Sequence, residues 1–152
     1  MRRFVVLALL VAAAAAYPAV LLAGGNGSGN GTACVFTTQL SPANEVPPTS
    51  STTFGHTQIK IRNDATVEWK THIVNDGETF VAGHVHAAPV GINGSIVVPL
   101  FSGSDSSAQF RDSGEQTIDS ALAANICAHP EQYYVNYHTT AHPGGALRGQ
   151  LG

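Results

Sequence analysis

The chain has 152 residues, of which 11% are charged, and a formal net charge of −3. Without Arg2 and Arg3 near the N-terminus, five Lys and Arg side chains stand against ten Asp and Glu, a net charge of −5. The sequence has no basic patch and no run of like charge, so the composition argues against nucleic acid and against an anionic membrane surface as partners.

The N-terminal segment predicts export from the cytoplasm. Arg2 and Arg3 precede an apolar run from Phe4 to Ala16, a pattern typical of a secretory signal peptide, here assigned to residues 1–23. An uncleaved N-terminal anchor is the alternative, since Phe4 to Ala23 could span a bilayer, although Pro18 interrupts this run. We therefore expect a secreted, cell-surface or periplasmic protein.

Residues 24–31 form a Gly/Asn/Ser linker with no apolar side chain to bury. The remaining residues, 32–152, suit one domain with one hydrophobic core. Two cysteines lie in this domain, Cys34 and Cys127. In an exported chain such a pair predicts one disulfide, worth ~4 kcal/mol in the chain-entropy model for a loop of this length. Two buried free thiols are the alternative.

Short β-strands separated by turn residues account for most of the domain. Residues 34–40, 54–62, 66–74, 80–87, 95–101, 133–139 and 146–151 are predicted strands, and residues 54–62 and 66–74 alternate clearly between apolar and polar side chains. One short helix is predicted over 119–128, with Asp119 as its N-cap and Pro130 after its end. The pattern indicates an all-β, antiparallel Greek-key β-sandwich or barrel with one short helix.

Two segments in the second half of the domain carry weaker signals. Residues 102–107 are expected to form a polar loop, and residues 108–111 a short edge strand. In the strand over 80–87, Val81, Val85 and Ala87 are expected to face the core, because strand side chains alternate between the two faces.

Seven histidines are unusual in a chain with so few charges. His84 and His86 are two residues apart on one predicted strand, so their imidazoles share a face, and His138 lies on the polar face of another strand. If the two strands are neighbours, three neutral imidazoles could bind Cu(II) or Zn(II). The alternative is that these histidines lie at a surface and form hydrogen bonds with loop carbonyls.

Other side chains are weaker candidates. His142 and His56 are further candidate ligands for the same ion. Glu45, in a proline-rich loop, is expected to accept hydrogen bonds from loop amides, and Arg148 to stack on an aromatic ring or bind a carboxylate. The sequence lacks the motifs of a nucleophile elbow, a phosphate-binding loop and a zinc-protease helix.

Four motifs in order resemble the chordin-type domain, CHRD. They are Ala43-Asn-Glu-Val-Pro-Pro48, Ala82-Gly-His-Val-His-Ala87, Tyr134-Val-Asn-Tyr-His-Thr139 and Pro143-Gly-Gly-Ala-Leu-Arg-Gly-Gln-Leu151. The resemblance implies a β-sandwich or barrel in an extracellular module. It also implies that the residues to suspect are those matching the motifs, namely Glu45, His84, His86, His138 and Arg148, whereas His56 and His142 lie outside them.

The His-x-His pair and the glycine-rich end are also similar to Cu/Zn superoxide dismutase, whose copper ligands include such a pair on a Greek-key barrel. This chain departs from that family, because it has no dense His/Asp zinc loop after His86 and no bridging histidine. We therefore expect a histidine site for copper, or for zinc, without a second metal. If the protein is an enzyme, the similarity implies copper-dependent redox chemistry such as superoxide dismutation.

Two other functions fit the same sequence. One is a non-enzymatic interaction module that binds an extracellular protein or a glycan through its loops, and the other is a structural subunit that assembles through an exposed edge strand. Measuring how activity and stability depend on metal and pH distinguishes these two functions from a metal site. The affinity of a metal site for its ion falls as ordinary histidines protonate near pH ~6.5.

Overall fold

The computed structural model describes residues 31–152. In chain order the elements are β1 (Thr32–Leu40), η1 (Pro42–Asn44), β2 (Phe54–Arg62), β3 (Thr66–Val74), β4 (Phe80–Ala87), β5 (Ser95–Asp105), β6 (Gln109–Thr117), α1 (Ser120–Ala128), η2 (Pro130–Gln132), β7 (Tyr133–Thr139) and β8 (Leu147–Gln150). The predicted signal peptide or anchor, residues 1–23, and nearly all of the predicted linker, 24–31, lie outside the described residues. Within residues 31–152, no helix has both the length and the apolar character needed to cross a bilayer.

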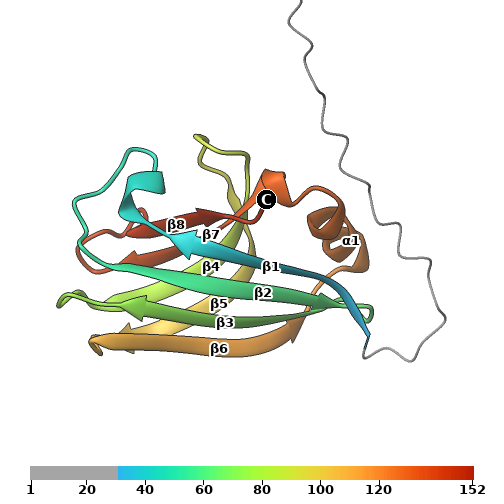
Figure 1. Ribbon diagram of the computed structural model, residues 1–152, viewed down its shortest axis with the longest axis horizontal. Coiled ribbons are helices and arrows are strands. Elements are labelled where there is room, and N and C mark those ends of the chain that lie inside the picture. The colour runs from blue at the N-terminus through green and yellow to red at the C-terminus, as the bar shows by residue number, and fades with distance from the viewer. Residues whose placement is uncertain (1–30) are drawn as a thin grey trace, which may run out of the picture.

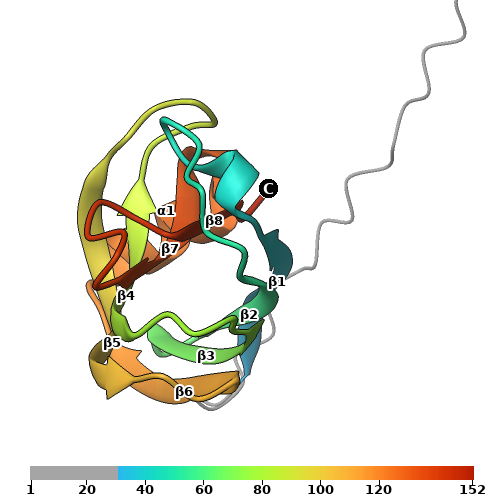
Figure 2. The ribbon, with the colours of Figure 1, turned by 90° about the vertical axis from the view of Figure 1, so that its left-hand side faces the viewer.

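The strands form two antiparallel sheets of four strands that face each other as a β-sandwich (Figures 1 and 2). The first sheet has the order β1-β2-β3-β6 and the second β5-β4-β7-β8. The chain crosses to the second sheet for β4 and β5 and returns to place β6 beside β3, which is a Greek-key connection. The predicted all-β fold is confirmed, and of its two predicted forms the structure has the sandwich.

The core lies between the two sheets and follows the alternation predicted for β2 and β3. Ile59 and Ile61 on β2, and Val67 and Ile73 on β3, are at most 1% exposed. Apart from the buried Thr66, their neighbours along each strand point the other way and are partly or fully exposed. The first sheet therefore has one apolar face and one polar face, as is common in antiparallel sheets.

The two strands after the loop at 88–94 are longer than predicted. β5 continues to Asp105, into the segment 102–107 that was expected to be a loop and of which only residues 106–107 lie outside a strand, and β6 covers Gln109–Thr117 instead of 108–111 only. Backbone pairing extends them: Ser102 and Asp105 pair with β4, and β6 pairs with the whole of β3. These extensions are mostly polar, so hydrophobic periodicity did not reveal them. The predicted position of β6 at a sheet edge is confirmed.

A β-bulge near the start of β4 changes which side chains face the core. The register shifts between Phe80 and Ala82 against both neighbouring strands. As a result Phe80 is fully buried in the core, whereas Val81, predicted to face it, is only half-buried and lies outside the core. From Gly83 onward the predicted alternation holds, with Val85 in the core and His84 on the opposite face.

The helix and the disulfide close one end of the sandwich. The Asp119 carboxylate accepts hydrogen bonds from two backbone N–H groups of the first turn of α1, as predicted for its N-cap. Ile126 of α1 is 1% exposed and packs in the core. Cys34 on β1 and Cys127 on α1 form the predicted disulfide, which ties the helix to the first strand.

Candidate metal centre

Three imidazoles converge on the outer face of the second sheet. His84 and His86 come from β4, and His138 comes from the neighbouring strand β7. Their candidate ligand nitrogens all lie within 4.8 Å of one another, and Nδ1 of His84 is 3.1 Å from Nε2 of His138. Metal–nitrogen bonds of about 2.0–2.1 Å hold two ligand nitrogens up to about 4 Å apart. Small side-chain rotations therefore suffice for these three residues, the histidine cluster, to surround one ion.

Backbone carbonyls fix the tautomer of two of the three rings. Nδ1 of His86 lies 3.0 Å from the carbonyl oxygen of Gly94, and Nδ1 of His138 lies 3.0 Å from that of Pro143. Because a carbonyl can only accept, each Nδ1 carries the hydrogen and each Nε2 is an unprotonated acceptor. The Nε2 of His138 accepts from Nδ1–H of His84 at 3.1 Å, whereas the Nε2 of His86 keeps a free lone pair. The same arrangement is typical of metal-ligating histidines, whose second nitrogen donates to a backbone carbonyl or a carboxylate.

The Nε2 atom of His86 is the most informative atom of the cluster. It is buried, and no hydrogen-bond partner for it lies within the part of the chain that the structure describes. A buried acceptor without a partner costs free energy and is rare in folded proteins. A metal ion bound between the three rings would give this lone pair a partner, so the donor set fits a transition metal.

Burial keeps the histidine cluster neutral. Desolvation, with the nearby His138 and His86 as a smaller cause, lowers the pKa of His84 to about 4. Desolvation likewise lowers the pKa of His86 and of His138. Metals bind the neutral imidazole, so protons compete with a metal here only at a more acidic pH than at ordinary histidines. A metal site here would therefore weaken at a lower pH than the pH ~6.5 expected for ordinary histidines.

Tyr134 is stacked between His86 and Arg148. The rings of His86 and Tyr134 are nearly parallel, with centroids 4.9 Å apart and an interplanar angle of 8°. Cζ of Arg148 lies 3.4 Å from the centroid of the Tyr134 ring. Because β7 lies between β4 and β8, the histidine and the guanidinium occupy opposite sides of the tyrosine. This stack restrains the orientation of the His86 ring.

The buried guanidinium of Arg148 also holds the loop over residues 88–94. It is 2% exposed and donates hydrogen bonds to the carbonyl oxygens of Pro89, at 3.0 Å, and Ile92, at 2.9 Å. This loop provides the Gly94 carbonyl that orients His86. Arg148 thus positions the histidine cluster from two sides, through the loop and through Tyr134.

Glu45 is buried one side chain away from the histidine cluster. Its Oε2 accepts a hydrogen bond from the Asn136 amide at 3.3 Å instead of from the loop amides that were expected. Asn136 pairs across the sheet with His84 on one side and Arg148 on the other. Desolvation raises the pKa of Glu45 to about 7, although the charge of Arg148 and the bond from Asn136 act in the opposite direction.

The two further candidate ligands do not join the histidine cluster. His56 lies on β2, on the outer face of the opposite sheet, where its ring is 5.7 Å from that of His72. Since the whole sandwich separates it from the histidine cluster, it cannot ligate the same ion. Nε2 of His142 lies 3.9 Å from Oε1 of Glu78, and the residue lines an open cavity of about 330 Å³ beside Pro143.

Sequence reasoning missed the residues that orient the ligands. Tyr134 and Asn136 lie on the same strand as His138, but the sequence assigned no role to either. The carbonyls of Gly94 and Pro143 could not have been found, because a backbone acceptor depends on loop conformation and leaves no signal in residue type.

The fold and the disulfide define an all-β module of a kind consistent with an extracellular location. The chain belongs to the CHRD domain family, whose family model matches residues 36–151. The matched range contains Glu45, Arg148 and all three residues of the histidine cluster. No curated protein and no solved structure matches the chain significantly.

Proposed function

We propose that this protein is an exported CHRD-domain protein whose His84, His86 and His138 bind one transition metal ion, copper in the first place and zinc in the second. The observation that carries the proposal is the buried, unpartnered Nε2 of His86 within a cluster whose ligand nitrogens lie within 4.8 Å of one another. The disulfide supports an oxidising compartment outside the cytoplasm.

The chemistry of the donors favours particular metals. Imidazole nitrogens suit Cu(II) and Zn(II), whereas Cu(I) prefers thiolate and thioether ligands. Residues 31–152 contain no methionine and no free cysteine, so a copper(I) carrier fits the domain poorly. Three protein nitrogens leave at least one position open, where bound copper would supply one-electron redox chemistry and zinc would act as a Lewis acid.

The chain's own residues prepare the site. The carbonyls of Gly94 and Pro143 keep the hydrogens on the Nδ1 atoms of His86 and His138, so that both Nε2 atoms are unprotonated. Arg148 and Tyr134 hold the loop and the ring of His86 in place. Because two ligands are pre-oriented and all three are neutral, metal binding requires no proton loss from the imidazoles at neutral pH and displaces only the hydrogen bond between His84 and His138.

Calorimetric titration of the mature, chelator-treated protein with Cu(II) and with Zn(II) tests the proposal. We expect one tight site per chain, abolished in the double variant His84→Ala/His86→Ala. The matched control is His56→Ala/His72→Ala, which removes two histidines from the other sheet and should retain the site. A single His84→Ala variant, at the half-exposed ligand, guards against loss of folding.

Retention of the tight site in His84→Ala/His86→Ala with unchanged stoichiometry would contradict the assignment. If neither metal binds the wild type, the protein is better explained as a non-enzymatic extracellular interaction module. If copper binds tightly, superoxide dismutation is the first reaction to assay, since it needs only an open position reached by a small oxidant.

A further inference from the structure

The outer face of the first sheet carries most of the positive charge of the domain. Residues 31–152 contain five Lys and Arg side chains. One of them, Arg148, is buried on the second sheet, and the alternation of β2, β3 and β6 places the others on this outer face: Lys60, Arg62, Lys70 and Arg111. This face thus holds four of the five cations of a domain that is acidic as a whole, together with Glu68 and Glu115.

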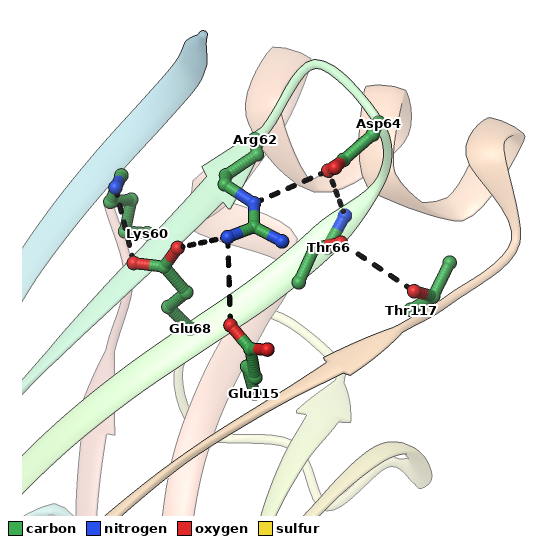
Figure 3. Close-up of polar contacts among 7 residues, drawn as sticks. All are labelled: Lys60, Arg62, Asp64, Thr66, Glu68, Glu115 and Thr117. Carbon is green, nitrogen blue, oxygen red and sulfur yellow. Dashed lines mark hydrogen bonds and ion pairs between the residues drawn. The ribbon is translucent and has the colours of Figure 1, made fainter. Parts of the chain in front are cut away.

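One half of this face is neutralised by its own acidic residues, as Figure 3 shows. Nζ of Lys60 lies 3.1 Å from Oε2 of Glu68. The Arg62 guanidinium lies 2.8 Å from Glu68, 3.4 Å from Asp64 and 3.5 Å from Glu115. These two cations are fully paired within the sheet, so this half offers little charge to a partner.

The other half carries cations without acidic partners. Lys70 and Arg111 are exposed, and within residues 31–152 neither lies within ion-pairing distance of an acidic side chain. Arg111 is directly opposite His72, which is directly opposite His56, and Lys70 is two residues from His72 along β3. Diagonal neighbours in a sheet lie about 7–8 Å apart, so the four nitrogen-bearing side chains form one compact group.

An exposed aromatic ring borders this group. Phe54 is 59% exposed and lies two residues from His56 on the same face of β2. Amide side chains complete the surface: Gln58 is directly opposite Lys70, and Gln109 is bonded to His72 at 2.7 Å. We call this surface the cationic half-face, defined by Phe54, His56, Gln58, Lys70, His72, Gln109 and Arg111.

We propose that the cationic half-face binds an acidic oligosaccharide, one that carries carboxylate or sulfate groups. Lys70 and Arg111 pair with the anionic groups, the amides and imidazoles bond to hydroxyls, and a sugar ring packs on Phe54. The surface is only three strands wide, about 10–15 Å. It therefore suits a short stretch of a glycan chain, whereas a longer polyanion such as DNA would extend over the acidic remainder of the domain.

The proposal is independent of the metal site, which lies on the opposite sheet. A fluorescently labelled heparin tetrasaccharide and a galacturonic acid tetrasaccharide serve as probes, in an anisotropy titration of the full mature chain at about 0.05 M salt, where the Debye length exceeds 10 Å. We expect both to bind and to be released at about 0.5 M salt. A neutral glucan of equal length should bind far more weakly.

The two halves of the face provide a matched pair of variants. Lys70→Gln/Arg111→Gln should weaken binding about tenfold, since two exposed ion pairs together contribute on the order of 1–2 kcal/mol. Lys60→Gln/Arg62→Gln removes the same net charge from the neutralised half and should change affinity less than about twofold. Phe54→Ala should weaken binding of both probes without changing its salt dependence.

Equal losses in the two double variants would overturn the proposal, because the effect would then reflect net charge alone. It would also be overturned if neither probe binds, or if single-stranded DNA or anionic lipid vesicles bind more tightly than the oligosaccharides. Copper or zinc stoichiometry, measured on the same variants, should be unchanged. A failure of this proposal is therefore distinguishable from a failure of the proposed metal site.

Discussion

The buried carboxyl of Glu45 should make the stability of this domain fall as pH rises through the neutral range. Its pKa is raised from an ordinary value of 4.5 to about 7, chiefly by burial. Between these two values the folded protein keeps a proton that the unfolded chain releases, so the free energy of unfolding decreases as pH rises. Glu45→Gln replaces the protonated carboxyl with a neutral group of the same shape and should remove this dependence.

The rise in pKa sets the size of the effect. Each tenfold change in proton affinity is worth about 1.4 kcal/mol. Ionisation of the Glu45 carboxyl therefore lowers the free energy of unfolding by at most about 3 kcal/mol at pH 8 and by less than about 1 kcal/mol at pH 5. Glu45→Gln should therefore be more stable than the wild type at pH 8 by up to that amount, and nearly equal to it at pH 5.

Urea unfolding of the metal-free wild type and of Glu45→Gln, at both pH values, measures the difference. Glu131→Gln is the matched control, because it removes the same charge from an exposed side chain and should give the same small change at both pH values. If Glu45→Gln is destabilised at pH 8, or shifts stability equally at pH 5 and pH 8, then the carboxyl is ionised in the fold and the reasoning is wrong.

Three further predictions follow from the same structure. Because burial lowers the pKa of His84 to about 4, bound metal should be retained at about pH 5.5; equilibrium dialysis showing half-release near pH ~6.5 would contradict this. Replacing Cys34 and Cys127 with Ser should lower the free energy of unfolding by about 2–4 kcal/mol in urea, since the bridge closes 93 residues. Tyr137→Phe should cost about 1–3 kcal/mol in the same assay, because the buried hydroxyl lies 2.7 Å from Oδ2 of Asp112; an unchanged midpoint in either variant would refute its prediction.

Most of the fold prediction depended on the alternation of apolar and polar side chains along the strands. The bounds of β2, β3, β4 and β7 were predicted to the residue, because each has an apolar stripe and a turn signal at its ends. The extensions of β5 and β6 were missed because they are polar and are held by backbone pairing alone. The bulge at Phe80 was missed for a related reason, since it depends on register with two neighbouring strands.

The candidate site was predicted in part. His84 and His86 share a face by spacing alone, but their convergence with His138 required β4 and β7 to be neighbours, which periodicity cannot show. His56 was named as a further ligand because residue type carries no information on which sheet a strand joins. The family resemblance directed attention to Glu45 and Arg148, and the structure shows that both are buried beside the histidine cluster.

The central claim is that the histidine cluster holds a transition metal, and elemental analysis tests it most directly. The protein would be purified without a histidine tag, alongside the double variant His84→Ala/His86→Ala. We predict about one copper or zinc ion per wild-type chain, as expected of a three-histidine site, and none in the variant. A metal-free wild type that gains no thermal stability from added copper or zinc would contradict the claim.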